Sequence, residues 1–154
     1  MTVQLTWTEL LIQDVAQEAM MAELTAWSFL LQGSVAPIFL NRFGSWFLRR
    51  RDDSVDLLDV LGGSVTRIAE THASFVQAVN TQEWQEHYLA SRTVFDLHLA
   101  GVVATGSHCY AVKPHPARGG PDPLKGHAVQ PDRAMVMPFW MWQSFCRQSL
   151  GGPA

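Results

Sequence analysis

The sequence contains no apolar run of the roughly 18 residues that a membrane-spanning helix requires. Its first residues, MTVQLTWTELLIQD, lack the positively charged stretch and the apolar core of a secretory signal peptide. These two absences predict a cytosolic protein that contacts no membrane. Its two cysteines, Cys109 and Cys146, are therefore expected to be reduced.

Strong charge of either sign is also missing. The 154 residues include 11 Lys or Arg and 14 Asp or Glu, which gives a net charge of −3. No basic field of the kind that attracts nucleic acid is present, so we expect no nucleic-acid partner. Hydrophobic residues make up 47% and charged residues 16%, a normal globular composition with enough apolar mass for one core.

Sequence motifs for metal or cofactor binding are absent. His98, His108, Cys109, His115 and His127 offer imidazole and thiolate groups, which are common zinc ligands. No C-x-x-C or H-x-x-x-H pair fixes two of them on one turn, and neighbouring residues of an extended chain point to opposite faces. We therefore expect no metal site and no cofactor.

The segment SHCYAVKPHPARGG, residues 107–120, concentrates reactive and structural residues. Cys109 with His115 or His127 could form a thiolate–imidazole pair, but the spacing does not define the geometry. Cysteine is often buried as a small hydrophobe, and Cys109 is expected on a strand that faces the core. The prolines stiffen the path, and Gly119-Gly120 permits a chain reversal. The segment is predicted to be architectural, so the protein is not expected to be an enzyme.

The first 36 residues are predicted to be helical. Thr6 and Glu9 form a capping-box pattern before an apolar stretch with helical spacing, which predicts a helix over residues 7–22. A second short helical segment is expected to reach Leu31, with Gly33 and Pro37 closing the region.

Residues 37–150 are predicted to form one α+β domain. Frequent β-branched and aromatic residues, with turns at 52–54 and 62–63, predict strands at 38–42, 46–50, 55–60 and 65–69. Because the connections are short, neighbouring strands must be antiparallel. The fold class is therefore α+β: an antiparallel meander sheet with the N-terminal helix and two central helices packed on it.

Helical spacing returns after Thr71. A short helix carrying Phe75 is expected, and then a longer one that is capped near Asn80 and Glu83 and ends at Gly101. Residues 102–133 are expected to be mostly irregular. The stretch 134–142, AMVMPFWMW, is predicted to be extended, with Pro138 favouring an edge or bulge, and a short helix is expected at 144–150.

Two groups of residues are candidates for binding a partner. On a strand, Trp140 and Trp142 would share one side, which could face something other than the protein's own core. Arg49 and Arg50 belong to a basic run that is expected at a hairpin tip in water, next to two aspartates.

Several short motifs, taken in order, resemble a bacterial family. They are Phe43-Gly44 with Trp46-Phe47-Leu48, the Leu57–Val60 strand, Cys109-Tyr110, Pro114-x-Pro116 and Gly119-Gly120. This family of domains of unknown function includes the C-terminal domain, often beside a GAD-like domain, of immunity proteins that neutralise a type VI secretion DNase effector. The resemblance covers roughly residues 37–148. It implies a cytosolic α+β domain without catalytic residues, in which the Cys-Tyr and Pro-Gly-Gly elements determine the fold.

The leading hypothesis is a non-catalytic immunity protein that binds a cognate toxin. Its affinity would come from a few buried aromatic residues inside a mildly acidic rim. Two alternatives stay open: a Cys/His-dependent hydrolase that uses Cys109, and a scaffold that oligomerises through its Trp-rich C-terminal segment.

Overall fold

The predicted meander is the centre of the molecule. The computed structural model of the chain describes residues 5–153. Its main sheet contains β1 (Val35–Leu40), β2 (Trp46–Arg50), β3 (Val55–Asp59) and β4 (Ser64–Ala69), in that order and all antiparallel. The predicted sheet topology is confirmed, and β2 has the predicted bounds.

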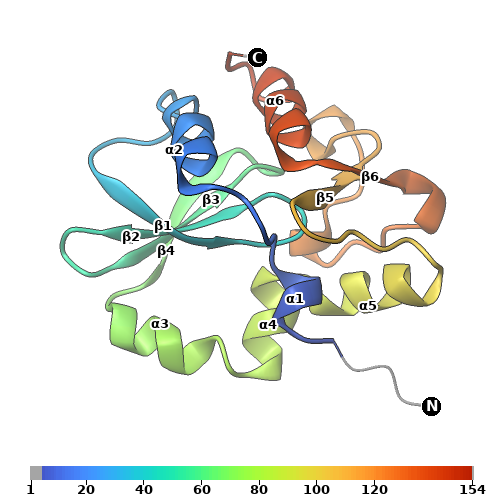
Figure 1. Ribbon diagram of the computed structural model, residues 1–154, viewed down its shortest axis with the longest axis horizontal. Helices are drawn as coiled ribbons and strands as arrows, with labels where there is room; N and C mark the ends of the chain where they lie inside the picture. Colours follow the sequence, from blue (N-terminus) through green and yellow to red (C-terminus); the bar gives the residue numbers. More distant parts are fainter. Residues whose placement is uncertain (1–4, 154) are drawn as a thin grey trace.

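Helices lie on both sides of this sheet. Figure 1 shows α2 (Gln17–Thr25) and α6 (Phe139–Ser149) on one side, with the other four on the opposite side. Those four are α1 (Trp7–Leu10), α3 (His72–Ala78), α4 (Gln82–Tyr88) and α5 (Ser91–Leu99). A second, two-stranded sheet pairs β5 (His108–Val112) with β6 (Ala134–Pro138). The α+β fold class is confirmed.

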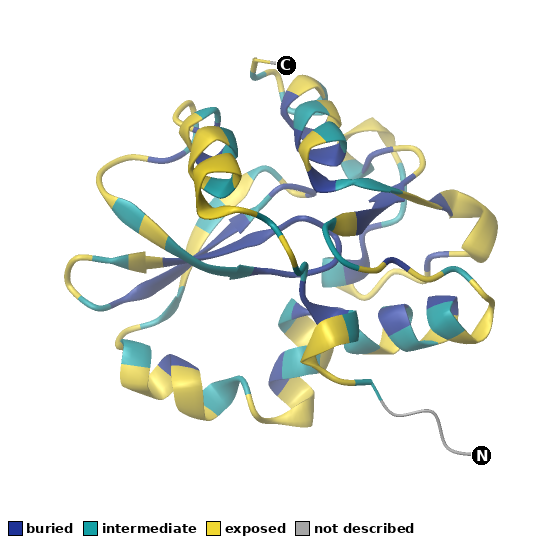
Figure 2. Cartoon of the chain, in the orientation of Figure 1, coloured by how far each residue is buried: buried dark blue, intermediate teal, exposed yellow. Residues whose placement is uncertain are grey.

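Burial on both faces of β2 explains its uninterrupted apolar run. Trp46, Phe47 and Leu48 are all fully buried, and Figure 2 shows buried, dark blue strand segments at the centre of the sheet. Side chains alternate along a strand, so Trp46 faces Phe139 of α6 while Phe47 faces Phe75 of α3. The sheet therefore has an apolar core on each side.

The N-terminal helix is shorter than predicted. The capping box of Thr6 and Glu9 is present, but α1 has a single turn. It ends because Leu11 leaves the helix to form an antiparallel bridge with Asn41, just beyond β1. Asp14 then adopts a positive φ of 58°, and the chain starts again as α2. The prediction of one helix over residues 7–22 is wrong.

The chain between α2 and β1 contains turns, and no second helix reaches Leu31. Gly33 has a φ of 78°, which suits its predicted place at a reversal. Pro37 lies inside β1 at a register shift, so the expected boundary between residues 36 and 37 falls within a strand. The N-terminal segment also contributes to the main core, through Leu10, Leu11, Leu24, Trp27 and Leu31.

The predicted longer central helix is divided into α4 and α5. The N-cap of α4 is Thr81, one residue after the predicted Asn80, and its hydroxyl accepts a hydrogen bond from the backbone N–H of Trp84. The division falls at Ala90, which has a left-handed φ of 50°. Gly101 follows α5 with a φ of 84°, as the sequence predicts for a residue that ends a helix.

The C-terminal part differs most from expectation. The strand placement of Cys109 is confirmed, although the surrounding region was expected to be mostly irregular. The prediction that residues 134–142 are extended is correct only as far as Pro138. Helix α6 begins at Phe139, five residues before the predicted helix. Phe139, Trp142 and Cys146 are buried at spacings of three and four residues, which is a helical face.

One amide side chain holds α6 against the rest of the molecule. Gln143 is fully buried, and its Oε1 accepts hydrogen bonds from the indole N–H groups of Trp27, at 2.7 Å, and Trp46, at 3.0 Å. Its Nε2 donates to the carbonyl oxygen of Gly44, at 2.8 Å. The N-terminal segment, β2 and α6 therefore meet at one side chain.

Replacing this amide is expected to destabilise the fold strongly. Gln143→Leu would leave two indole donors and one carbonyl buried without partners, and each such loss costs about 1–3 kcal/mol. We predict that the free energy of unfolding, measured by urea denaturation, falls by at least about 3 kcal/mol. Gln148→Leu on the exposed face of α6 is the matched control and should change it by less than about 0.5 kcal/mol. Equal stabilities of the two variants would contradict the role given to Gln143.

Candidate functional site

An apolar hollow on the described surface lies between α6 and the β5–β6 sheet. We call it the α6 groove, and its volume is about 330 Å³. Its lining residues come from both strands, the loop after β5 and one flank of α6: Ala111, Val112, Lys113, Pro114, His115, Arg118, Met135, Met137, Trp142, Phe145 and Ser149. Two strands and a helix thus form most of its walls.

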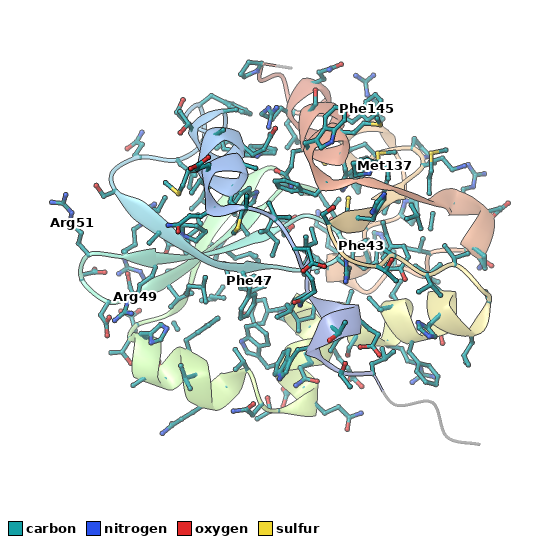
Figure 3. All side chains as sticks on the ribbon, in the orientation of Figure 1. Phe43, Phe47, Arg49, Arg51, Met137 and Phe145 are labelled. Atoms are coloured by element: carbon teal, nitrogen blue, oxygen red, sulfur yellow. The ribbon has the colours of Figure 1, made fainter. Side chains whose placement is uncertain are left out.

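Large apolar side chains are exposed along this groove. Phe145 on α6 is 48% exposed and Met135 on β6 is 45% exposed. Figure 3 shows Phe145 on α6 beside Met137 of β6. Clustered exposed apolar groups of this kind are typical of surfaces that bind another protein.

The inner wall of the groove is fixed by buried contacts. Trp142 is 3% exposed, and its indole N–H donates to the carbonyl oxygen of Phe43 at 2.8 Å. The ring of His115 packs against the Trp142 ring, with 5.7 Å between the centroids. The groove is therefore a preformed surface, which reduces the entropy lost when a partner binds.

The rim of the groove is basic. Its only charged lining residues are Lys113 and Arg118, and Arg118 donates to the hydroxyl of Ser149. Neither cation has a carboxylate within salt-bridge distance among residues 5–153. This basic rim differs from the mildly acidic rim that the sequence suggested for a binding surface.

The charge is segregated along the chain. Residues 105–154 carry five Lys or Arg and two Asp or Glu, whereas residues 1–104 carry six and twelve. The part that builds most of the groove is therefore net +3 within a chain of net charge −3. The small overall charge conceals this separation.

Only one of the two candidate tryptophans is accessible. Trp140 is 56% exposed, but it does not line the groove, whereas Trp142 is buried in the groove wall. The two were expected to share one side because a strand was assumed. On a helix, residues two apart lie about 200° apart around the axis, so that expectation is wrong.

The candidate arginines are the last two residues of β2, directly before the hairpin tip that joins β2 to β3. Arg49 forms an ion pair with Asp53, and Arg50 binds Asp56 at 2.8 Å and the carbonyl oxygen of Gln32. Figure 3 places Arg49 and Arg51 at the opposite end of the molecule from Phe145. The structure does not bring the candidate arginines and tryptophans together.

The thiols are buried. Cys109 has no exposed surface, and its Sγ lies 3.6 Å from the carbonyl oxygen of Met137. Burial raises the pKa of Cys109 and also that of Cys146. Both side chains therefore favour the neutral thiol over the nucleophilic thiolate.

The imidazoles near Cys109 in the sequence are held by the backbone. His115 Nδ1 accepts the N–H of Ala117 at 3.0 Å, so its Nε2 carries the proton and donates to the carbonyl oxygen of Val60 at 2.9 Å. Burial lowers the pKa of His115. His127 Nδ1 accepts the N–H of Asp122. This arrangement does not assemble a pair of Cys109 with either imidazole, and the absence of catalysis stays a prediction.

Two further questions concern the part of the chain that the structure describes: whether metal ligands cluster in it and whether a helix in it could span a membrane. Across residues 5–153, no three His, Cys, Asp or Glu side chains are grouped as a metal ion would need. The same residues include no helix with both the length and the apolarity to cross a membrane. The expectation that the protein uses no metal and no cofactor remains a prediction.

Comparison with known proteins gives no family. No family model matches the chain, and a search of curated proteins finds no match. The resemblance to immunity-protein domains therefore stays a prediction.

The loop after β5 explains the Pro-Gly-Gly element. Gly119 has a φ of 93° and open space around its Cα, whereas a Cβ on Gly120 would lie 1.7 Å from the carbonyl oxygen of Pro114. The N–H of Gly120 also donates to the carbonyl oxygen of His115. Glycine is thus favoured at the two positions for different physical reasons. Gly119 has a left-handed backbone, and Gly120 lies too close to another backbone segment for a side chain.

This difference predicts unequal effects of alanine. Gly119→Ala adds only left-handed strain, about 1 kcal/mol. Gly120→Ala forces two backbone segments apart, and we expect a loss of about 3 kcal/mol or more. Thermal and urea unfolding of both variants measure which of them loses more stability. If Gly120→Ala were no less stable than Gly119→Ala, the loop would not be packed as described.

Proposed function

We propose that the chain is a non-catalytic protein-binding domain whose docking surface is the α6 groove. The observation that carries this proposal is an exposed apolar groove with a basic rim, formed by a helix and a sheet. Phe145 and Met135 would serve as anchors, while Lys113 and Arg118 would favour a partner with acidic groups.

The nature of the partner is a further part of the proposal. The motif resemblance supports a cytosolic immunity protein, and its partner would be a secreted bacterial toxin such as a type VI secretion DNase effector. Inhibition would follow from covering the effector's surface, which requires no reactive side chain. The neutral, buried thiol of Cys109 is consistent with such a mechanism.

The proposal predicts a sharp difference between the two ends of the molecule. In complex with a secreted protein encoded beside this chain, Phe145→Asp should raise the dissociation constant at least about 30-fold, as expected for a central anchor. Arg51→Asp, an equal exchange to aspartate on the exposed hairpin tip, is the matched control and should change it less than about threefold. Titration calorimetry measures both constants.

A growth assay tests the immunity role itself. Cells that express the adjacent secreted protein should survive when the wild-type chain or Arg51→Asp is present, and should die with Phe145→Asp. Survival with Phe145→Asp, together with loss of protection by Arg51→Asp, would move the docking surface to the hairpin tip and overturn the proposal.

A further inference from the structure

Strand β6 has an unpaired edge next to the α6 groove. In the described residues β6 pairs only with β5, and Lys113 N donates to Arg133 O while Phe139 N donates to Ser107 O. In an antiparallel ladder, hydrogen-bonded residue pairs alternate with pairs that are not hydrogen-bonded. The backbone groups of Met135 and Met137 therefore form hydrogen bonds with β5. Val136 therefore points its N–H and its C=O away from the sheet.

No other group satisfies the Val136 backbone. Within residues 5–153, neither its N–H nor its C=O has a hydrogen-bond partner outside the strand, and the residue is 36% exposed. The neighbouring Ala134 N–H is already taken by the carbonyl oxygen of Pro131. The free edge is thus short and centred on Val136.

The two edges of the main sheet carry features that discourage pairing. The outer strand β1 contains Pro37 and a register shift, and the outer strand β4 carries the charged Arg67. Proline, irregular register and charge are the usual protections of an exposed edge. By contrast β6, with the sequence AMVMP, has no charged residue and a proline only at its last position.

The face of β6 that lines the groove lies beside this unpaired edge and near positively charged residues. Met135 and Met137 line the groove, and so does Lys113, whose backbone N–H donates to the carbonyl oxygen of Arg133, the residue directly before β6. Arg133 and Lys113 are both exposed. Neither has a carboxylate partner within the described chain.

We propose that β6 accepts an extended, acidic peptide segment of a partner protein as an added β-strand. The segment exchanges hydrogen bonds with Val136 and places apolar side chains beside Met135 and Phe145, with a carboxylate near Arg133 and Lys113. Main-chain bonds give affinity in this mode of recognition, and the side-chain positions give specificity. A second copy of this chain is disfavoured as the occupant, because its own β6 edge would bring like charges together.

This inference rests on the proposed function and specifies the bound segment. The probe is the blocked heptapeptide Glu-Thr-Val-Thr-Val-Thr-Glu, whose glutamates and valines share one face in either strand direction. Its control carries lysine in place of both glutamates. Titration of the isotope-labelled chain, followed by NMR, should shift the Val136 amide resonance with the acidic peptide and leave it unmoved with the lysine peptide. Salt should weaken the binding.

Val136→Pro tests the backbone bond directly. The Val136 N–H points outward, so proline removes a donor to the peptide and no hydrogen bond of the fold. We expect at least a tenfold higher dissociation constant, whereas Val136→Thr, which keeps the N–H, should bind within about threefold of wild type. The melting temperature of each variant shows whether it is folded. The NMR titration of the wild-type chain tests the inference without either variant.

Three results would overturn the inference. They are an unmoved Val136 amide at millimolar acidic peptide, equal binding of the lysine peptide, and self-association of the chain that protects the Val136 amide without any peptide. If the peptide fails while Phe145→Asp still abolishes binding of the adjacent secreted protein, the added strand is wrong and the groove proposal stands. If Phe145→Asp also has no effect, the proposed function fails as well.

Discussion

The hydrogen bonds of Gln143 determine where α6 lies. One side-chain oxygen accepts two indole N–H groups, and the amide nitrogen of the same side chain donates to the chain just before β2. Because all of these groups are buried, a displaced helix would leave several of them without partners, at a cost of a few kcal/mol. The wall of the α6 groove is therefore a consequence of polar geometry inside the core.

A second buried polar group fixes β5 and, through it, β6. The guanidinium of Arg42 is fully buried and donates to the carbonyl oxygens of Thr8, Glu9, Gly106 and His108. The carbonyl of Arg42 accepts the N–H of Tyr110 at 2.7 Å. One edge of the small sheet is thus bound to the main domain, which leaves the outer edge of β6 as the one that can accept another strand.

The meander could be predicted because its signals are local. Short turns allow only antiparallel neighbours, and the apolar run at Trp46 is buried on both faces of β2. The end of α1 could not be predicted, since it depends on a bridge between Leu11 and the distant Asn41. The capping pattern was right, but a tertiary contact ended the helix.

The candidate site was only partly predictable, for a physical reason. An apolar stretch such as MPFWMW fits a buried strand or a buried helix equally well, and the choice decides which side chains face solvent. The assumed strand placed Trp140 and Trp142 together, and Phe145, although part of the same aromatic cluster, was not among the candidate binding residues. Had the helix been recognised from the spacing of Phe139, Trp142 and Cys146, Phe145 would have been found on its exposed flank. The basic rim was hidden by the small net charge.

The most direct test of this account is photo-crosslinking in living cells that contain the natural partner. The photoreactive residue p-benzoylphenylalanine is placed at position 145 in one variant and at position 51 in another, and crosslinked segments are identified by mass spectrometry. The account predicts that position 145 crosslinks to an acidic segment of one partner protein and that position 51 does not. Crosslinks from position 51 alone, or crosslinks from position 145 to basic segments, would contradict it.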